Sequence, residues 1–338
     1  MKAKTNVEPM EKNPIYVIRQ MVKRMVLEEE IPFDISNLSR IISEAEFHLY
    51  EVHYNGKTYY KVDEMIPHTL FISGPEEESS IAIAGDIHSG FINSYTSWDL
   101  HDKFLDEGVD KGVVNFIYAG DICEGTAIYK GQNILCQNVT SEGQANIFFN
   151  KIIGKLRKYK EDGKKIRLIF ISGNHDLMFP AIGQDNPVEL LVNMLKNEGI
   201  DAYYISNFVA NVIIGGACYR VVHLDDHYGK YENVPCLKYY HNVEENITVR
   251  YKDDIYLIAG LICGHVHKRF LYNPRVFDYS KKWPRKRSET EVFLSGYRPL
   301  FVAQAGTLKK HVYKKRKFGH FIKCYLDGRG VPQSYEVL

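Results

Sequence analysis

Five short apolar segments of this sequence are each followed at once by Asp, Asn or His, usually through a glycine. The segments read IAIA, FIYA, IFIS, YRVV and LIC, and they are followed by GDIH, GD, GNHD, H and GHVH. The side chains there that could bind a metal ion are Asp86, His88, Asp121, Asn174, His223, His265 and His267. Oxygen and imidazole donors of this kind suit Mn²⁺, Zn²⁺ or Fe. Seven donors are too many for one tetrahedral ion, so they predict two divalent ions that share a carboxylate.

Two further residues of the third segment could act on a substrate beside such ions. His175 directly follows Asn174, so we expect its ring to face the substrate and to stabilise or protonate the leaving oxygen. We expect Asp176 to hold the His175 ring in the correct tautomer. The alternative is that His175 is only a structural turn residue.

The elements that must position these residues begin near residue 81. Short apolar, β-rich runs recur from there, and polar segments compatible with helices, such as 144–160 and 187–196, separate several of them. Continuous apolar strands are typical of sheets covered on both faces, which predicts a layered α/β domain. Ligands of such sheets bind at the carboxyl ends of the strands, so the five strand ends are expected to meet at one edge.

Residues 1–66 have a different pattern. Asn13 and Pro14 are typical of a helix start, Asp34 can cap a second short helix, and Asn55-Gly56 lies between two alternating aromatic runs as in a β-hairpin. Helix, short helix and hairpin is the order of a winged helix-turn-helix, although a plain helix-hairpin packing unit has the same order. We expect residues 67–80 to be a linker and residues 81–338 to form the main domain.

Composition narrows the class of protein. The chain has 338 residues, of which 45% are hydrophobic and 25% charged, and this is the composition of a globular protein. It contains no run of 18 apolar residues and no apolar stretch typical of a signal peptide, so no membrane association is expected. Its six cysteines are scattered without a CxxC pair, which favours reduced thiols and a cytoplasmic location.

Positive charge is concentrated near the carboxyl terminus. Residues 268–317 contain 15 lysines and arginines but only three acidic residues, whereas the whole chain has a net charge of +1. Aromatic residues are interleaved with these cations, as expected of a surface that binds phosphates and stacks on bases. A solvated lysine-rich edge is the alternative. The cations expected to contact substrate are Lys268, Arg269, Lys281, Lys282, Arg285, Lys286 and Arg287.

The blocks GDIH, GDICEG, GNHD, VVHL and GHVH, in this order, resemble the pattern of the calcineurin-like metallophosphoesterases over roughly residues 80–310. The resemblance implies a β-sandwich flanked by helices and a site with two divalent ions, Mn²⁺ first, with Zn²⁺, Fe or Mg²⁺ as alternatives. By analogy Asp86, His88 and His267 would bind the first ion, Asn174, His223 and His265 the second, and Asp121 both. The family's fourth histidine directly follows a strand, which favours His223. His227 stays open there as the alternative ligand or as a substrate contact.

The second block extends the resemblance. GDICEGTAIYKGQ is similar to a run in the exonuclease small subunit of archaeal family D DNA polymerase and in phage-type phosphoesterases, and it differs from the GDxVDRG run of Ser/Thr protein phosphatases. This implies a phosphodiesterase or nuclease acting on DNA or RNA. The alternatives are a phosphomonoesterase, a cyclic-nucleotide phosphodiesterase, and a catalytically silent scaffold subunit. The sequence names no protein partner.

Overall fold

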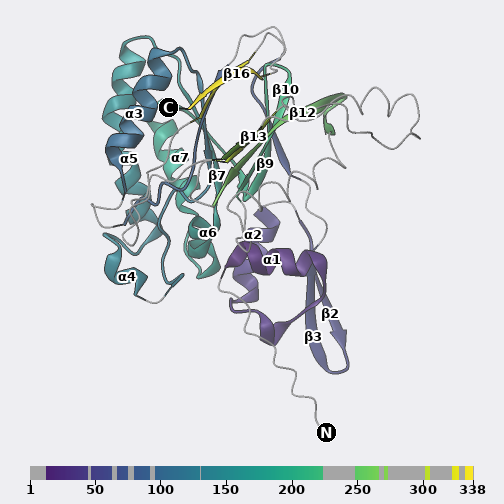
Figure 1. Cartoon of the computed structure of the whole chain (residues 1–338). Coiled ribbons are helices and arrows are strands. Elements are labelled where there is room, and N and C mark those ends of the chain that lie inside the picture. Colours follow the sequence, from purple (N-terminus) through teal and green to yellow (C-terminus); the bar gives the residue numbers. More distant parts are fainter. Residues whose placement is uncertain are drawn as a thin grey trace, which may run out of the picture.

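The computed structural model describes residues 13–44, 47–62, 67–74, 80–91, 96–129, 131–223, 248–265, 270–272, 301–304, 322–326 and 332–337. These residues form a mixed α/β structure in which two large sheets face each other, helices cover one of them, and a smaller amino-terminal unit packs at one end (Figure 1). In this part of the chain, no helix combines the length and apolar character needed to cross a membrane.

The first large sheet has the strand order β16-β15-β5-β6-β7-β8. Four neighbouring strands of this sheet run parallel to one another. They are β5 (Ser80–Ala84), β6 (Asn115–Ala119), β7 (Arg167–Ser172) and β8 (Asp201–Asn207). The antiparallel pair at the other edge is β15 (Ile322–Leu326) and β16 (Pro332–Val337). The parallel strands bring their carboxyl ends to one edge of the sheet.

The second large sheet has the order β13-β14-β12-β10-β9-β4, and β11 pairs with β12 beside it. Its strands are β4 (His68–Phe71), β9 (Val209–Ile214), β10 (Ala217–His223), β11 (Thr248–Tyr251), β12 (Asp254–Gly264), β13 (Phe270–Tyr272) and β14 (Phe301–Gln304). Strands β10 and β12 are parallel, so they end at the same edge. Residues 67–80 were expected to be a linker, but four of them form β4, which pairs with β9.

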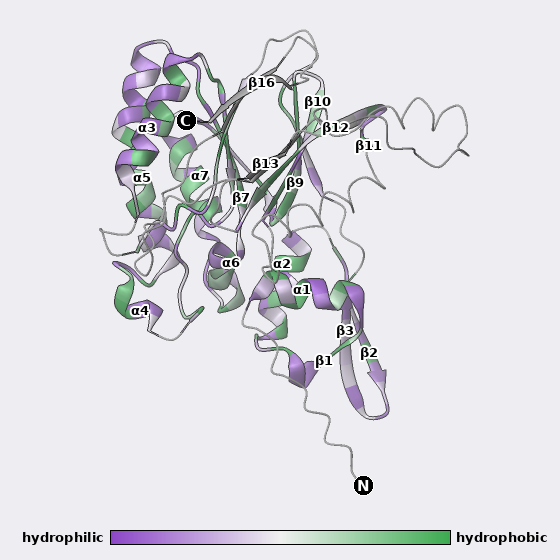
Figure 2. Cartoon of the chain, viewed as in Figure 1, coloured by the Kyte–Doolittle hydropathy of each residue, from purple (hydrophilic) through white to green (hydrophobic). Residues whose placement is uncertain are grey.

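Alternation along the strands divides the core into two layers. Ile81 and Ile83 of β5 face the second sheet, in a cluster that also contains Val212 and Tyr219, whereas Ala82 and Ala84 face the helices. Figure 2 colours β7 and β9 largely as hydrophobic. Both faces of β5, β6 and β7 are therefore covered, which is why their sequences are continuously apolar.

Three long helices cover the outer face of the first sheet (Figure 1). They are α3 (Trp98–Asp110), α5 (Ser141–Glu161) and α7 (Pro187–Asn197). The helices expected over 144–160 and 187–196 are confirmed. Two short helices, α4 (Gln132–Leu135) and α6 (Asn174–Ala181), follow β6 and β7.

The amino-terminal unit contains both expected helices and the expected hairpin. Its elements are α1 (Pro14–Lys23), β1 (Val26–Leu27), a 3₁₀ helix (Glu28–Glu30), α2 (Ile35–Glu44), β2 (Leu49–Tyr54) and β3 (Lys57–Val62). The Asn13 side chain caps α1, and Asn55 and Gly56 form the turn with positive φ angles of 53° and 71°. The small sheet has the order β1-β3-β2, with both pairs antiparallel.

The unit shares its core with the main body. Leu38, Ile41 and Ile42 of α2 belong to the same buried cluster as Leu177 of α6 and Val222 of β10. Hydrogen bonds from side chains of α2 to backbone carbonyls at the end of α6 reinforce this packing. The predicted boundary near residue 66 therefore separates two parts of the sequence that fold around common apolar side chains.

Candidate metal centre

The ends of β5, β6, β7, β10 and β12 meet at one edge of the two sheets. Hydrogen bonds connect the loops that follow these strands. The His88 amide donates to the Asp121 carbonyl (3.0 Å), and the His265 amide donates to the Asp86 carboxylate (3.0 and 3.1 Å). His223 Nδ1 donates to the Ala119 carbonyl (2.8 Å), so the second sheet is joined to the first beside the site.

Four of the residues expected to bind metal have unusual backbone conformations. Asp86, His88, Asp121 and His265 have positive φ angles of 53°, 54°, 51° and 89°. Residues other than glycine rarely adopt positive φ angles, because this backbone conformation is strained. Such residues are concentrated at functional sites, where the surrounding structure holds the strained backbone in place. Each of these turns re-aims a side chain immediately after a strand.

Two glycines allow the loops to approach closely. A Cβ atom on Gly173 would lie 2.2 Å from Asp121 Oδ1, and one on Gly264 would lie 2.0 Å from the Ala119 carbonyl oxygen. Neither distance is tolerable for a carbon atom. The glycines that precede Asn174 and His265 are therefore required by the closeness of the neighbouring strand ends.

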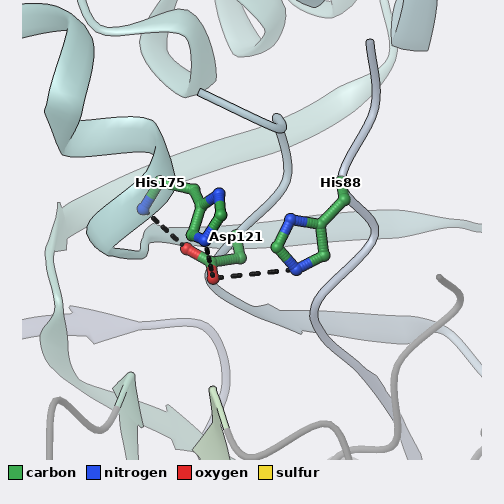
Figure 3. Close-up of side chains that lie close together, drawn as sticks. All are labelled: His88, Asp121 and His175. Carbon is green, nitrogen blue, oxygen red and sulfur yellow. Dashed lines mark hydrogen bonds and ion pairs between the residues drawn. The ribbon is translucent and has the colours of Figure 1, made fainter. Parts of the chain in front are cut away.

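The Asp121 carboxylate lies at the centre of three imidazole rings. Its Oδ2 atom is 3.2 Å from His223 Nε2, 3.8 Å from His88 Nε2 and 3.9 Å from His175 Nε2. Figure 3 shows the His88 and His175 rings next to this carboxylate, and the centroids of the two rings are 4.5 Å apart. Burial favours the neutral acid, but the charges of His223 and His175 outweigh it and hold the Asp121 pKa well below its usual value. Asp121 is thus an ionised carboxylate with two oxygens available at the site.

A second group of donor atoms surrounds the Asn174 side chain. Asn174 Oδ1 lies 3.1 Å from His223 Nε2 and 3.0 Å from His265 Nδ1, and these two nitrogens are 3.2 Å apart. Because His223 Nδ1 carries the proton donated to the Ala119 carbonyl, neutral His223 directs the Nε2 lone pair at Asn174 and Asp121.

Acceptor atoms that face one another in this way need a hydrogen-bond donor or a cation between them. Without a cation, a proton on one of the imidazole rings can serve, and protonated His223 is one such donor. Burial opposes the charged ring, but the Asp121 carboxylate, with a further contribution from Asp86, raises the pKa of His223 to about 9. A divalent cation satisfies the same set of oxygen and nitrogen atoms. The residues present therefore fit a cation.

Two groups of donor atoms in the described residues are compact enough to hold an ion. One contains His88, Asp121 and His175, and the other contains Asp121, His223 and His265. Both groups include Asp121, as expected of a carboxylate that bridges two ions. His175 differs from expectation in one respect, because its ring belongs to the first group of donor atoms.

Glu124 is a buried residue of the site that the sequence analysis did not single out. Its Oε2 atom lies 3.0 Å from His88 Nδ1. Its Oε1 atom accepts hydrogen bonds from the Tyr129 hydroxyl (2.8 Å) and from the Gln132 side chain (3.1 Å). A signal was present, since all three residues belong to the run GDICEGTAIYKGQ. Within that run, Tyr129 and Gln132 hold the Glu124 carboxylate beside His88.

Asp176 has a different task from the one expected. The His175 ring is oriented by the Glu124 carbonyl, to which His175 Nδ1 donates at 2.5 Å. The Asp176 carboxylate instead accepts from the backbone N–H groups of Gly173 (2.8 Å), Ile122 (3.1 Å) and Cys123 (2.7 Å). The expectation failed because adjacent residues at the start of a helix point in different directions.

Asp176 joins the two loops that follow β6 and β7. Burial and the nearby Asp121 raise its pKa to about 7.

The remaining expected site residues divide clearly. Asp86, whose pKa is raised by burial, is fully buried beside the His265 backbone, and His223 lies in the cluster as expected. The residues that lie outside the described part of the chain are His227, His267, Lys268, Arg269, Lys281, Lys282, Arg285, Lys286 and Arg287.

No protein-family model matches this sequence, and a search of curated proteins finds no match.

Proposed function

We propose that the chain is a phosphoester hydrolase that depends on two divalent metal ions and acts on nucleic acid as a phosphodiesterase. The observation that carries the proposal is the position of Asp121, whose carboxylate belongs to both groups of converging donor atoms. The ordered blocks that resemble calcineurin-like metallophosphoesterases support the same reaction. They also support our proposal that the two facing sheets are the β-sandwich of that family.

The residues would divide the work as follows. His88 and Asp86, with His267 by resemblance, would hold one ion, and Asn174, His223 and His265 would hold the other, with Asp121 shared. Bound Mn²⁺ or a similar ion would supply Lewis-acid chemistry that polarises water and phosphoryl oxygens. The imidazole donors are already oriented, because His223 is fixed by a carbonyl and His88 lies beside the Glu124 carboxylate.

His175 is the candidate acid for the leaving oxygen. Its Nδ1 atom donates to the Glu124 carbonyl, so Nε2 is the atom that can exchange a proton with substrate. Its ring is 13% exposed, whereas those of His88 and His223 are fully buried. A substrate can therefore reach His175 more readily than the two histidines beside it.

Nucleic acid is the proposed substrate because residues 268–317 combine 15 cations with aromatic side chains, and because the second block is similar to a polymerase-associated exonuclease. In this proposal the cations from Lys268 to Arg287 bind phosphates of the nucleic-acid backbone on either side of the bond that is cleaved.

The experiment is hydrolysis of a bis-aryl phosphodiester, an aryl phosphomonoester, labelled DNA and labelled RNA, with Mn²⁺ or with EDTA. We expect diester and nucleic-acid cleavage that EDTA abolishes. Asp121→Asn should lose this activity and also lose Mn²⁺ binding in calorimetry, whereas Asp253→Asn, at an exposed turn, should keep both. Full activity of Asp121→Asn would contradict the shared-carboxylate site. Cleavage of the monoester alone would contradict nucleic acid as the substrate and would favour a phosphomonoesterase that acts on a small molecule.

A further inference from the structure

The amino-terminal unit has the order of helices and hairpin that suggests a winged helix-turn-helix, but its second helix packs against the main body. Asn37 donates to the Ala181 carbonyl (3.2 Å), and Arg40 donates to the carbonyls of Pro180 (3.2 Å) and Gln184 (2.6 Å). Arg40 is the one cation of α2. The helix that would enter a DNA groove in a winged helix is therefore used to bind the end of α6.

The hairpin of this unit has a different surface. Figure 1 shows β2 and β3 pointing away from the two large sheets. Residues paired across the hairpin lie on the same face, and the pairs Tyr50–Lys61, Val52–Tyr59 and Tyr54–Lys57 make up one face. This surface, which we call the tyrosine face, contains three tyrosines, two lysines and no acidic residue.

The tyrosine face is exposed toward its tip. Tyr50 is 49% exposed and Tyr54 is 62% exposed, and Lys57 is also exposed. The opposite face differs in both respects. There Tyr60 and Val62 are buried, and Glu51 lies 3.1 Å from the His53 ring. The exposed tyrosine rings and both lysines of the hairpin are thus on one side of it.

We infer that the tyrosine face binds single-stranded nucleic acid and guides it toward the metal centre, an inference that rests on the proposed function. Tyr50 and Tyr54 are four residues apart on β2, so their Cα atoms are about 13 Å apart, and each ring can stack on a different base of one strand. Lys57 adds a cation for the phosphates. Positive charge and aromatic rings without acidic residues complement a polyanion that carries planar bases.

The position of the unit suits this role. Its helix α2 packs on α6, and α6 begins with Asn174 and His175 at the metal centre. The hairpin therefore belongs to a unit that packs against the helix carrying two residues of the site.

The test is binding of a fluorescein-labelled oligothymidine of about 20 nucleotides, followed by anisotropy in EDTA so that no cleavage occurs. Changing Tyr50→Ser and Tyr54→Ser together should raise the Kd at least about tenfold, because two stacking surfaces are removed. Tyr50→Phe with Tyr54→Phe should bind as the wild type does, because the rings remain. His53→Ser, on the opposite face, should also bind normally.

Hydrolysis of the bis-aryl phosphodiester, measured with Mn²⁺ on the same variants, separates the two proposals. It should be unchanged by the tyrosine substitutions, whether or not nucleic acid binds. Wild-type binding by the double serine variant would overturn the inference, and so would an equal loss in the double phenylalanine variant or in His53→Ser. A change in self-association of the serine variant with unchanged oligothymidine binding would also overturn it, since the edge strand β2 would then serve protein pairing.

Discussion

At Asp121 three imidazole nitrogens approach one carboxylate oxygen. Those of His88 and His175 belong to one group of donor atoms, and that of His223 belongs to the other. Single residues explain why this arrangement exists. Positive φ angles turn Asp121 and His88 inward, and Gly173 admits the Asp121 side chain where any Cβ would collide with it. At this scale the site depends on backbone conformations that few residue types adopt, as well as on the identity of the donors.

His175 gives a prediction at the residue scale. His175→Ala should slow hydrolysis of diesters with poor leaving groups by roughly 10²–10⁴-fold, and slow those with good leaving groups less, because the latter need no proton. Mn²⁺ affinity should stay at the wild-type value. Rates across a series of leaving groups, together with calorimetric titration of Mn²⁺, check both parts. A loss of Mn²⁺ binding would make His175 a ligand in the group with His88 and Asp121, and would remove its role as an acid.

At the scale of elements, the loop between β6 and α5 supports His88. Glu124 lies beside His88 Nδ1, and Tyr129 and Gln132 hold the Glu124 carboxylate. We predict that Glu124→Ala weakens Mn²⁺ binding about 10–100-fold, the range found when a partner of a metal-binding histidine is removed. Tyr129→Phe should weaken it less, because the Gln132 contact remains.

Titration calorimetry on protein stripped with a chelator measures this effect. Glu142→Ala, exposed in the first turn of α5, serves as the matched control. Mn²⁺ affinity equal to the wild type in Glu124→Ala would mean that the loop positions only the His175 ring, through its backbone carbonyl.

The packing of α3 on the first sheet makes a separate prediction about pH. His101 of α3 is fully buried and its Nε2 lies 3.0 Å from the Tyr118 hydroxyl of β6. Burial, with a smaller effect from Lys155, lowers the His101 pKa from 6.5 to about 3. The unfolded chain therefore binds a proton that the folded chain does not. Neutral His101 therefore contributes fully to the free energy of unfolding above pH 6.5, and this contribution is lost as the pH falls from there toward 3.

We expect His101→Gln to weaken this pH dependence, because its amide can still contact Tyr118 but does not titrate. Between pH 7.5 and 5.5 the wild type should lose about 1.4 kcal/mol of unfolding free energy more than the variant. Urea unfolding in EDTA at the two pH values measures the difference. His53→Gln, whose ring is 73% exposed, should behave as the wild type. Equal pH dependence in the wild type and His101→Gln would rule out His101 as the source.

For the whole molecule, the sequence predicted what depends on local pattern. Asp86, Asp121, Asn174, His223 and His265 could be found because each follows a strand directly, and parallel strands end together. The hairpin at Asn55-Gly56 and the cap at Asn13 are equally local signals, and both are confirmed.

Contacts between distant segments could not be predicted. Glu124 meets His88 across 36 positions of sequence, and His68–Phe71 pair with a strand some 140 residues later. No short-range pattern marks either event. The direction of the Asp176 side chain also escaped prediction, because it depends on which backbone N–H groups the neighbouring loop presents. The metal ligand expected at His267 and the basic segment stay predictions.

The core shared by the amino-terminal unit and the main body has a consequence for biosynthesis. Ile18, Leu38 and Ile41 are synthesised more than 160 positions before Phe208 and Val222, which lie in the same buried cluster. We therefore expect α1 and α2 to keep part of their apolar surface exposed until β9 and β10 have been synthesised, because contacts of such long separation form slowly. During translation, that exposed surface is where we expect chaperones to bind.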